Sequence, residues 1–187
     1  MPETVGVLSL QGDFEKHLQA LSRLGVQGQE VRTSEDLGRC SRLILPGGES
    51  TTLAILLRRH GLDEQIRKRI ADGMPAWGTC MGLILLANEV EGREQWTLGV
   101  LDVTVRRNAF GPQVHSFEAD IAIRGLDSGF HAVFIRAPVV TRLGEGVEPL
   151  AELEGKTVAV RSGRLLGTSF HPELTRDLRM HELFLSL

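Results

Sequence analysis

The sequence predicts an α/β fold with a central, mostly parallel sheet flanked by helices. Residues 5–10 and 42–45 are short, almost continuously apolar runs, which are typical of strands that are covered on both faces. Segments with apolar residues at helical spacing follow these runs, after turns that contain glycine. Strands that alternate with helices in this way indicate a doubly wound sheet, whose ligands bind at the carboxyl ends of the strands.

The first half of the chain alternates strands with helices. Asp13 is positioned to cap the first helix and Gly25 to end it, and Ser50 or Thr51 is expected to cap the next one. The expected strands are residues 5–10, a weak strand around 30–32, and residues 42–45, which follow a polar connection. The expected helices are residues 14–24, 53–60 and 62–72.

After Gly92 the pattern changes to strands with little helix between them, until a last helix over residues 177–187. No repeat, low-complexity tract or linker interrupts the chain, so residues 1–187 are expected to form one domain. The expected strands are residues 98–106, 117–123, 132–135, 147–153, 157–161 and 165–170, the last two joined by a hairpin turn at 162–164.

Residues 78–82 (GTCMG) carry the strongest chemical signal. A short apolar run ends at Gly78 and a helix-forming run follows Gly82, so Cys80 occupies a sharp strand-to-helix turn of the nucleophile-elbow kind. The flanking glycines let other chain segments approach this strained turn closely. The unpaired N–H groups of a helix N-terminus favour a thiolate, which makes Cys80 a candidate nucleophile. The alternative is a buried cysteine that only fills space.

A histidine near the C-terminus and a second glycine-rich turn, at residues 46–52 (PGGESTT), strengthen this interpretation. Pro172 favours an extended His171, which would place the side chains of His171 and Glu173 on the same side. A carboxylate at Nδ1 orients an imidazole toward a nucleophile. The histidines expected on helices, at solvent or at an interface, are His17, His60 and His181.

Composition argues against several classes of protein. The net charge of -3 and the lack of a basic run argue against nucleic-acid binding, and no apolar stretch is long enough to span a membrane. The first residues do not resemble a signal peptide, and two cysteines imply no disulfide framework, so a cytoplasmic location is expected. Cys40 lies in a polar stretch, and we assign it no role.

Residues 46–50 (PGGES), 78–82 (GTCMG) and 171–173 (HPE) resemble the three signatures of the class I glutamine amidotransferases, which use a Cys-His-Glu triad. Met81 departs from this resemblance, because the class implies a small residue, usually alanine, directly after the cysteine. Over essentially the whole chain, further stretches resemble the glutaminase subunits of bacterial pyridoxal 5'-phosphate synthases: residues 10–12 (LQG), 45–52 (LPGGESTT), 107–108 (RN), 116–120 (SFEAD), 133–138 (VFIRAP) and 169–175 (SFHPELT).

The resemblance implies a flavodoxin-like fold and hydrolysis of L-glutamine to L-glutamate and ammonia through a cysteinyl thioester, with Cys80, His171 and Glu173 as the triad. It implies no metal and no cofactor. The other residues that it implies are the backbone N–H groups of Gly47 or Gly48 and of Met81 for the oxyanion hole; Gly48, Glu49, Ser50, Arg107, Ile135 and Arg136 for L-glutamine binding; and Gln11 near the site or the partner.

The resemblance also implies a partner subunit, a (β/α)8 barrel that receives the ammonia through a tunnel. This synthase makes pyridoxal 5'-phosphate from a pentose phosphate and a triose phosphate. The glutaminase is expected to be weak until the partner orders its oxyanion hole. Nucleic acid and membrane are not expected as partners.

Three alternatives stay open at the level of sequence. The glutaminase of another synthase, such as that of histidine biosynthesis, would share the triad, but residues 10–12 and 133–138 argue against it. A cysteine peptidase or a DJ-1-like protein on a similar α/β fold would not carry Cys80, His171 and Glu173 in this layout. A non-catalytic subunit is disfavoured because all three triad residues are present.

Overall fold

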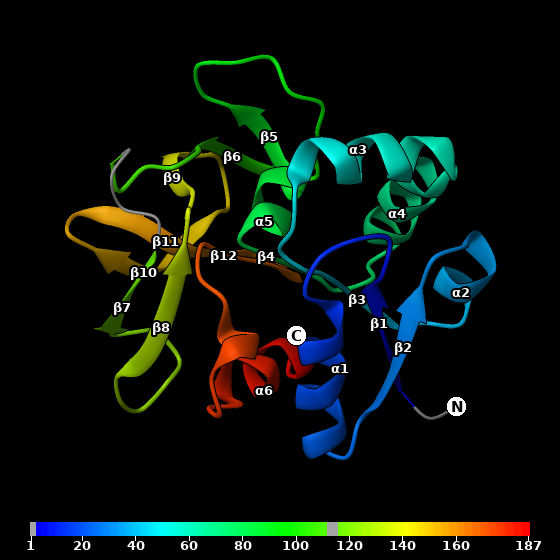
Figure 1. Cartoon of the computed structure of the whole chain (residues 1–187), viewed down its shortest axis with the longest axis horizontal. Helices are drawn as coiled ribbons and strands as arrows, with labels where there is room; N and C mark the ends of the chain where they lie inside the picture. The colour runs from blue at the N-terminus through cyan, green and yellow to red at the C-terminus, as the bar shows by residue number, and fades with distance from the viewer. Residues whose placement is uncertain (1–2, 112–115) are drawn as a thin grey trace.

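The structure is a computed structural model that describes residues 3–111 and 116–187, with the side chain of Ser50 left outside the description. A ten-stranded sheet runs through the molecule, and helices cover both of its faces (Figure 1). This arrangement confirms the predicted α/β fold with a central sheet flanked by helices. Among the described residues, no helix is both long and apolar enough to cross a membrane.

The sheet joins a parallel half to a mostly antiparallel half. Its order is β2-β1-β3-β4-β12-β11-β9-β6-β5, with β10 beside β11, and all neighbours from β2 to β12 are parallel. β7 and β8 form a separate antiparallel pair. The strands are β1 (Thr4–Leu8), β2 (Gln27–Val31), β3 (Arg42–Leu45), β4 (Ala76–Thr79), β5 (Ala87–Val90), β6 (Leu101–Arg106), β7 (Ser116–Ile121), β8 (Phe130–Ile135), β9 (Val139–Leu143), β10 (Glu148–Leu153), β11 (Lys156–Ser162) and β12 (Leu165–Thr168).

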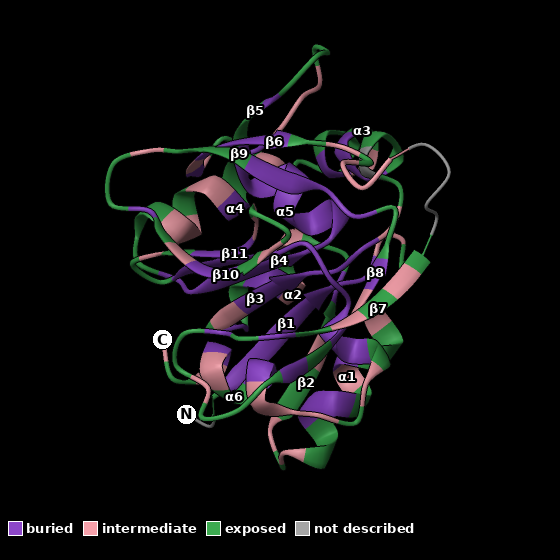
Figure 2. Cartoon of the chain, turned by 90° about the vertical axis from the view of Figure 1, so that its left-hand side faces the viewer, coloured by how far each residue is buried: buried purple, intermediate pink, exposed green. Residues whose placement is uncertain are grey.

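Alternate side chains of the strands enter two hydrophobic cores, one on each face of the sheet. In β3, Leu43 and Leu45 belong to the core that α3, α4 and α5 cover, whereas Ile44 belongs to the core under α1, α6 and β8. Figure 2 shows the buried strands between more exposed outer elements. The helices are α1 (Phe14–Arg23), α2 (Ser34–Gly38), α3 (Ser50–Arg59), α4 (Leu62–Ala71), α5 (Met81–Leu86) and α6 (Arg179–Leu185), with a 3-10 turn, η1 (Pro172–Leu174), before α6.

The parallel half of the sheet brings four strand ends to one edge. Gln11 follows β1, Gly47 follows β3, Cys80 follows β4 and His171 follows β12. The backbone N–H of Cys80 donates to the carbonyl of Thr168 at 2.7 Å, which continues the pairing of β4 with β12. Residues far apart in sequence therefore meet at the edge where ligands of such sheets bind.

Apart from the η1 turn, three elements are absent from the sequence prediction: α2, β5 and β9. The polar connection before β3 contains α2, because Thr33 and Asp36 form a capping box in which each side chain accepts from the backbone N–H of the other residue. The apolar run after Cys80 predicts helix up to Ala87, but the chain leaves the helix there and β5 pairs with β6. β9 lies between β6 and β11.

The two predicted helix caps also need correction. Asp13 occupies the cap position of α1, but its side chain makes no capping hydrogen bond. The cap of α3 is Glu49 and not Ser50 or Thr51. The Glu49 carboxylate accepts from the backbone N–H groups of Thr51 at 3.1 Å and of Thr52 at 2.7 Å. Glutamate can do this because its longer side chain folds back onto the first helical turn.

Close packing around the elbow requires glycine. A Cβ on Gly82 would lie 1.9 Å from the carbonyl oxygen of Leu45, and a Cβ on Gly78 would lie 2.5 Å from the carbonyl of Gly82. Both distances are shorter than any non-bonded contact between such atoms. The elbow glycines therefore serve the close approach of chain segments that the sequence predicts.

We expect Gly82→Ala to lower the free energy of unfolding by about 1–3 kcal/mol, because β3 and α5 must move apart to admit the methyl group. Gly38→Ala is the matched control: its Cβ would meet no other part of the chain within 4 Å. That change is expected to be neutral or slightly stabilising, since alanine favours helix. Urea unfolding of both variants measures the difference, and equal stability would contradict the packing argument.

Candidate active site

Cys80 lies at a strained turn between β4 and α5. Its backbone has φ 50° and ψ -107°, a conformation that costs a residue other than glycine on the order of 1–3 kcal/mol. The side chain is buried. The strand, sharp turn and helix predicted around Cys80 are confirmed. Such a turn projects its side chain beyond the end of the sheet, as in a nucleophile elbow.

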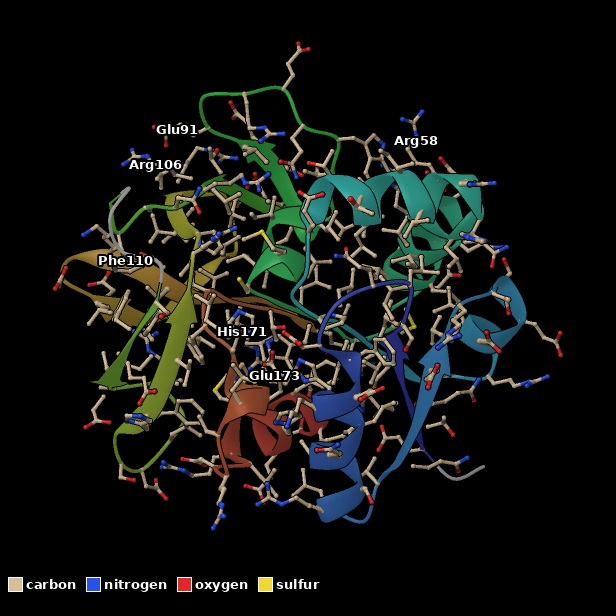
Figure 3. All side chains as sticks on the ribbon, in the orientation of Figure 1. Arg58, Glu91, Arg106, Phe110, His171 and Glu173 are labelled. Carbon is tan, nitrogen blue, oxygen red and sulfur yellow. The ribbon has the colours of Figure 1, made fainter. Side chains whose placement is uncertain are left out.

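His171 follows β12 and is held by two hydrogen bonds. Its backbone N–H donates to the carbonyl of Val133 at 2.8 Å, and its Nδ1 lies 2.7 Å from Oε1 of Glu173. Figure 3 shows both side chains near the middle of the molecule, on the segment between β12 and α6. The predicted contact between His171 and Glu173 is confirmed. Its cause differs from the prediction, because Glu173 lies in the η1 turn and not on an extended segment.

Cys80 and Glu173 both act on the protonation of the His171 imidazole. Burial lowers the pKa of His171, but the interactions with Cys80 and Glu173 outweigh burial and raise the pKa to about 10. Burial raises the pKa of Glu173, but its contacts with His17 and His171 outweigh this and lower the pKa. At neutral pH an imidazolium therefore lies between an ionised carboxylate and the sulfur.

The turn after β3 packs directly against His171. A Cβ on Gly47 would lie 2.7 Å from Cε1 of His171 and 3.6 Å from Cβ of Cys80, so only glycine leaves this space open. The Gln11 side chain closes the turn from the other side, since its Oε1 accepts from the backbone N–H of Glu49 at 3.2 Å. The residues of this region that the sequence singles out are Gln11, Gly47 and Gly48.

The Glu49 carboxylate is already engaged in the cap of α3. Burial raises the pKa of Glu49, but the hydrogen bonds from Thr52 and Thr51 outweigh burial and lower the pKa to about 2. Its Oε1 lies 4.0 Å from Nη2 of Arg107, whose Nη1 donates to Oε1 of Gln95 at 2.9 Å. Sequence reasoning misses Gln95, because it lies in an irregular segment without a motif. Ser50 begins α3, and its side chain lies outside the described residues.

Ile135 and Arg136 bring the end of β8 to Cys80. The carbonyl oxygen of Ile135 lies 3.6 Å from the Cys80 sulfur. The chain turns at Arg136, whose φ is 46° and whose side chain is exposed. Met81, the unusual residue of the elbow, is the first residue of α5 and is buried. The backbone of this turn, and not the Arg136 side chain, makes the contact with the sulfur.

Two further histidines lie behind Glu173, contrary to the prediction that they reach solvent or an interface. The side chains of His17 and His181 are fully buried, whereas His60 is exposed. Nδ1 of His17 lies 3.0 Å from Nε2 of His181, and Nε2 of His17 lies 3.4 Å from Oε2 of Glu173. The sequence does carry a signal for His17, because it lies one helical turn before Leu21 on the apolar face of α1.

Among the described residues, one group of potential metal ligands converges at the site. Ligand atoms of Asp13, His171 and Glu173 lie within 4.8 Å of one another. Nδ1 of His171 and Oε1 of Glu173 already bond each other at 2.7 Å, and Asp13 is exposed. We assign this group no metal.

Comparison with known proteins places the chain among the glutamine amidotransferases. The model of the SNO glutamine amidotransferase family matches residues 7–187. The chain is similar to the pyridoxal 5'-phosphate synthase subunit PdxT of Thermus thermophilus, with 56% identity over 100% of this chain and 98% of the relative. The subunit of the same name from Herpetosiphon aurantiacus is 57% identical over 98% of this chain and 100% of the relative.

Solved structures agree with the sequence relatives. A crystal structure of a glutamine amidotransferase matches with a TM-score of 0.93 and 55% identity, covering 97% of both chains. The structure of PurLQS from Thermotoga maritima matches with a TM-score of 0.70 at 17% identity over 99% of this chain and 98% of that one, which shows a shared fold alone. The family match over nearly the whole chain and relatives above half identity give one conclusion: the chain belongs to the SNO glutamine amidotransferase family.

Proposed function

We propose that this chain is the glutaminase subunit of a pyridoxal 5'-phosphate synthase, with Cys80, His171 and Glu173 as its catalytic triad. The observation that carries the proposal is the geometry of the site: Cys80 at the strained elbow and His171 both lie against Gly47, and Nδ1 of His171 bonds Glu173. A cysteine nucleophile, a proton carrier and an orienting carboxylate are the groups that acyl transfer needs. The glutamine amidotransferase family supplies the substrate class, and relatives named as subunits of pyridoxal 5'-phosphate synthase supply the pathway.

The reaction begins when the Cys80 thiolate attacks the side-chain amide carbon of L-glutamine. The C–S bond forms and the carbonyl oxygen becomes an oxyanion. Collapse of this intermediate breaks the C–N bond, and the His171 imidazolium gives its proton to the leaving nitrogen, so that ammonia departs. Neutral His171 then takes a proton from water, whose oxygen attacks the thioester and releases L-glutamate and the cysteine. Throughout, Glu173 holds Nδ1–H of His171 and stabilises the imidazolium.

The backbone groups nearest the sulfur are the proposed oxyanion donors. Met81 N–H begins α5, and Gly47 packs against both Cys80 and His171, with the Gly48 N–H as the alternative donor on that turn. Loss of one such donor typically costs about 100-fold or more in rate. The proposed L-glutamine-binding residues are Gly48, Glu49, Ser50, Arg107, Ile135 and Arg136.

The cap and pKa of Glu49 suggest its role in this binding. Its carboxylate stays ionised near neutral pH, because the α3 N–H groups hold it in that form. A fixed negative charge suits the α-ammonium group of L-glutamine, and the Arg107 guanidinium suits the α-carboxylate. The side chain would thus serve the helix and the substrate together.

The ammonia requires an acceptor that this chain does not supply. We assign that role to a (β/α)8-barrel synthase subunit, which would receive ammonia through a tunnel in a complex with Gln11 near the contact. Residues 1–187 would act as one glutaminase domain in the cytoplasm. The LQG and VFIRAP stretches, residues 10–12 and 133–138, favour this synthase over that of histidine biosynthesis.

The raised pKa of His171 gives a titration that can be measured. In NMR spectra of histidine-labelled protein, the His171 ring is expected to titrate near pH 10. Because the folded-state pKa exceeds the usual 6.5, the stabilisation by this imidazolium is complete below pH 6.5 and is lost as the pH rises through about 10. Glu173→Gln should lower the midpoint, since it removes a negative charge. A wild-type midpoint near 6.5 would refute the ion-pair description.

Release of L-glutamate from L-glutamine tests the proposed function. The purified chain is assayed alone and with the barrel synthase subunit, beside Cys80→Ala. We expect release that rises on addition of the synthase and falls at least about 1,000-fold in Cys80→Ala, because the nucleophile is lost. Cys40→Ala is the matched control and should keep full activity. If L-glutamate release does not change when the synthase subunit is added, the vitamin B6 assignment is refuted. If Cys80→Ala still releases L-glutamate, the triad is refuted.

A further inference from the structure

Behind the triad, Oε2 of Glu173, the oxygen that does not bond His171, faces the buried pair His17 and His181. The proposed reaction does not use these two histidines. We propose that His17 is a positioning residue: its neutral imidazole presents Nε2–H to Oε2 of Glu173 and so keeps Oε1 directed at His171. The inference rests on the proposed function, because it concerns the carboxylate that orients the catalytic imidazole. It extends the chain of contacts from Cys80 through His171 and Glu173 to His17 and His181.

The distances give Glu173 a different partner on each oxygen. Oε1 lies 2.7 Å from Nδ1 of His171, and Oε2 lies 3.4 Å from Nε2 of His17. Among the described residues, Oε2 has no hydrogen bond of good geometry, and its side chain is fully buried. Nε2 of His17 is also 3.4 Å from the Thr79 hydroxyl. A buried carboxylate oxygen without a donor is costly, so the nearby N–H of His17 is the group that can satisfy it.

The hydrogen-bonding partners determine the tautomers of both histidines. If His17 donates from Nε2, its Nδ1 is a bare acceptor, and Nε2 of His181, 3.0 Å away, must donate to it. Nδ1 of His181 is then bare as well. That atom is buried and has no partner among the described residues. A buried lone pair without a donor is less costly than a buried N–H without an acceptor, which favours this arrangement over the reverse one.

Burial keeps both rings neutral, and neutrality is what the role requires. Burial lowers the pKa of His17, although the charges of Glu173 and Asp13 oppose it and that of His171 adds to it. Burial also lowers the pKa of His181 to about 3, with His17 and Arg23 acting in the same direction and Glu173 against. A cationic His17 would neutralise Glu173 and weaken its hold on the His171 imidazolium. A neutral donor fixes the carboxylate and leaves its charge intact.

Aromatic packing holds the two rings in place. Trp77 of β4 meets His17 edge to face at 5.7 Å between ring centroids and His181 at 5.0 Å. The Trp77 indole N–H donates to the Thr168 hydroxyl at 3.1 Å, so the tryptophan is itself fixed. His17 thus sits in a rigid setting on α1, and α1 packs against the η1 turn that carries Glu173.

Kinetics of three variants with the synthase subunit test the role of His17. His17→Leu leaves Glu173 Oε2 without a donor, and we expect kcat to fall at least about 10-fold with KM changed less than about 3-fold. His17→Gln keeps one donor and one acceptor and should retain kcat within about 3-fold. Leu21→Ala removes packing from the same helix without touching a polar group and should leave kcat near wild type. Rates are divided by the amount of Cys80 that a glutamine-competitive label titrates, which removes any effect of unfolded protein.

Two kinetic results would overturn the proposal: His17→Leu with the kcat of Leu21→Ala, or His17→Gln as impaired as His17→Leu. A second measurement covers the case in which His17→Leu does not fold. Nitrogen-15 NMR of wild-type protein should show His17 and His181 with the proton on Nε2 and both rings with pKa values below the usual 6.5. A proton on Nδ1 of His17, or a His17 pKa at or above 6.5, would also overturn it. The two proposals fail in different experiments. Glutamate release by Cys80→Ala would refute the triad, whereas the NMR measurement tests His17 independently of activity.

Discussion

The hydrogen bond from the Cys80 N–H to the Thr168 carbonyl is the contact on which the site depends. It extends the pairing of β4 with β12, two strands that are neighbours in the sheet but far apart in sequence. Through it the turn that carries Cys80 and the segment that carries His171 are fixed to the same edge. Cys80 can then adopt its strained backbone, because the sheet on one side and α5 on the other hold it there. The chemistry of the site exists only after the parallel half of the sheet has formed.

Much of this arrangement could be predicted because it is local. The apolar runs of β1 and β3, the glycine-flanked elbow at Cys80 and the turn after β3 each follow from a few consecutive residues. The rule that ligands bind at the carboxyl ends of parallel strands then assembles them into one site. His171 and Glu173 were also expected to meet, although the 3-10 turn brings them together and not an extended strand. Short motifs predict the structure correctly where a few consecutive residues determine the backbone conformation.

The features that the sequence did not predict depend on contacts between distant segments or on competition for a side chain. β9 becomes a strand because β6 and β11 lie on either side of it. Glu49 caps α3, although the sequence offers Ser50 and Thr51, which are more usual caps. The histidines of α1 and α6 looked suited to solvent, although the place of His17 on the apolar face of α1 is a signal of its burial. That both rings meet each other and Trp77 follows only from the packing of distant segments.

The buried histidines also make the fold sensitive to acid. The pKa values of His17 and His181 are lowered in the folded chain, while in the unfolded chain both rings bind a proton near pH 6.5. Their contribution to stability is therefore complete above pH 6.5 and is lost as the pH falls toward the folded-state values, at about 1.4 kcal/mol per pH unit for each ring. Glu173, whose pKa is also lowered, adds to this loss at lower pH. Acid therefore destabilises this fold directly beside Glu173 and His171, where the two uncharged imidazoles lie.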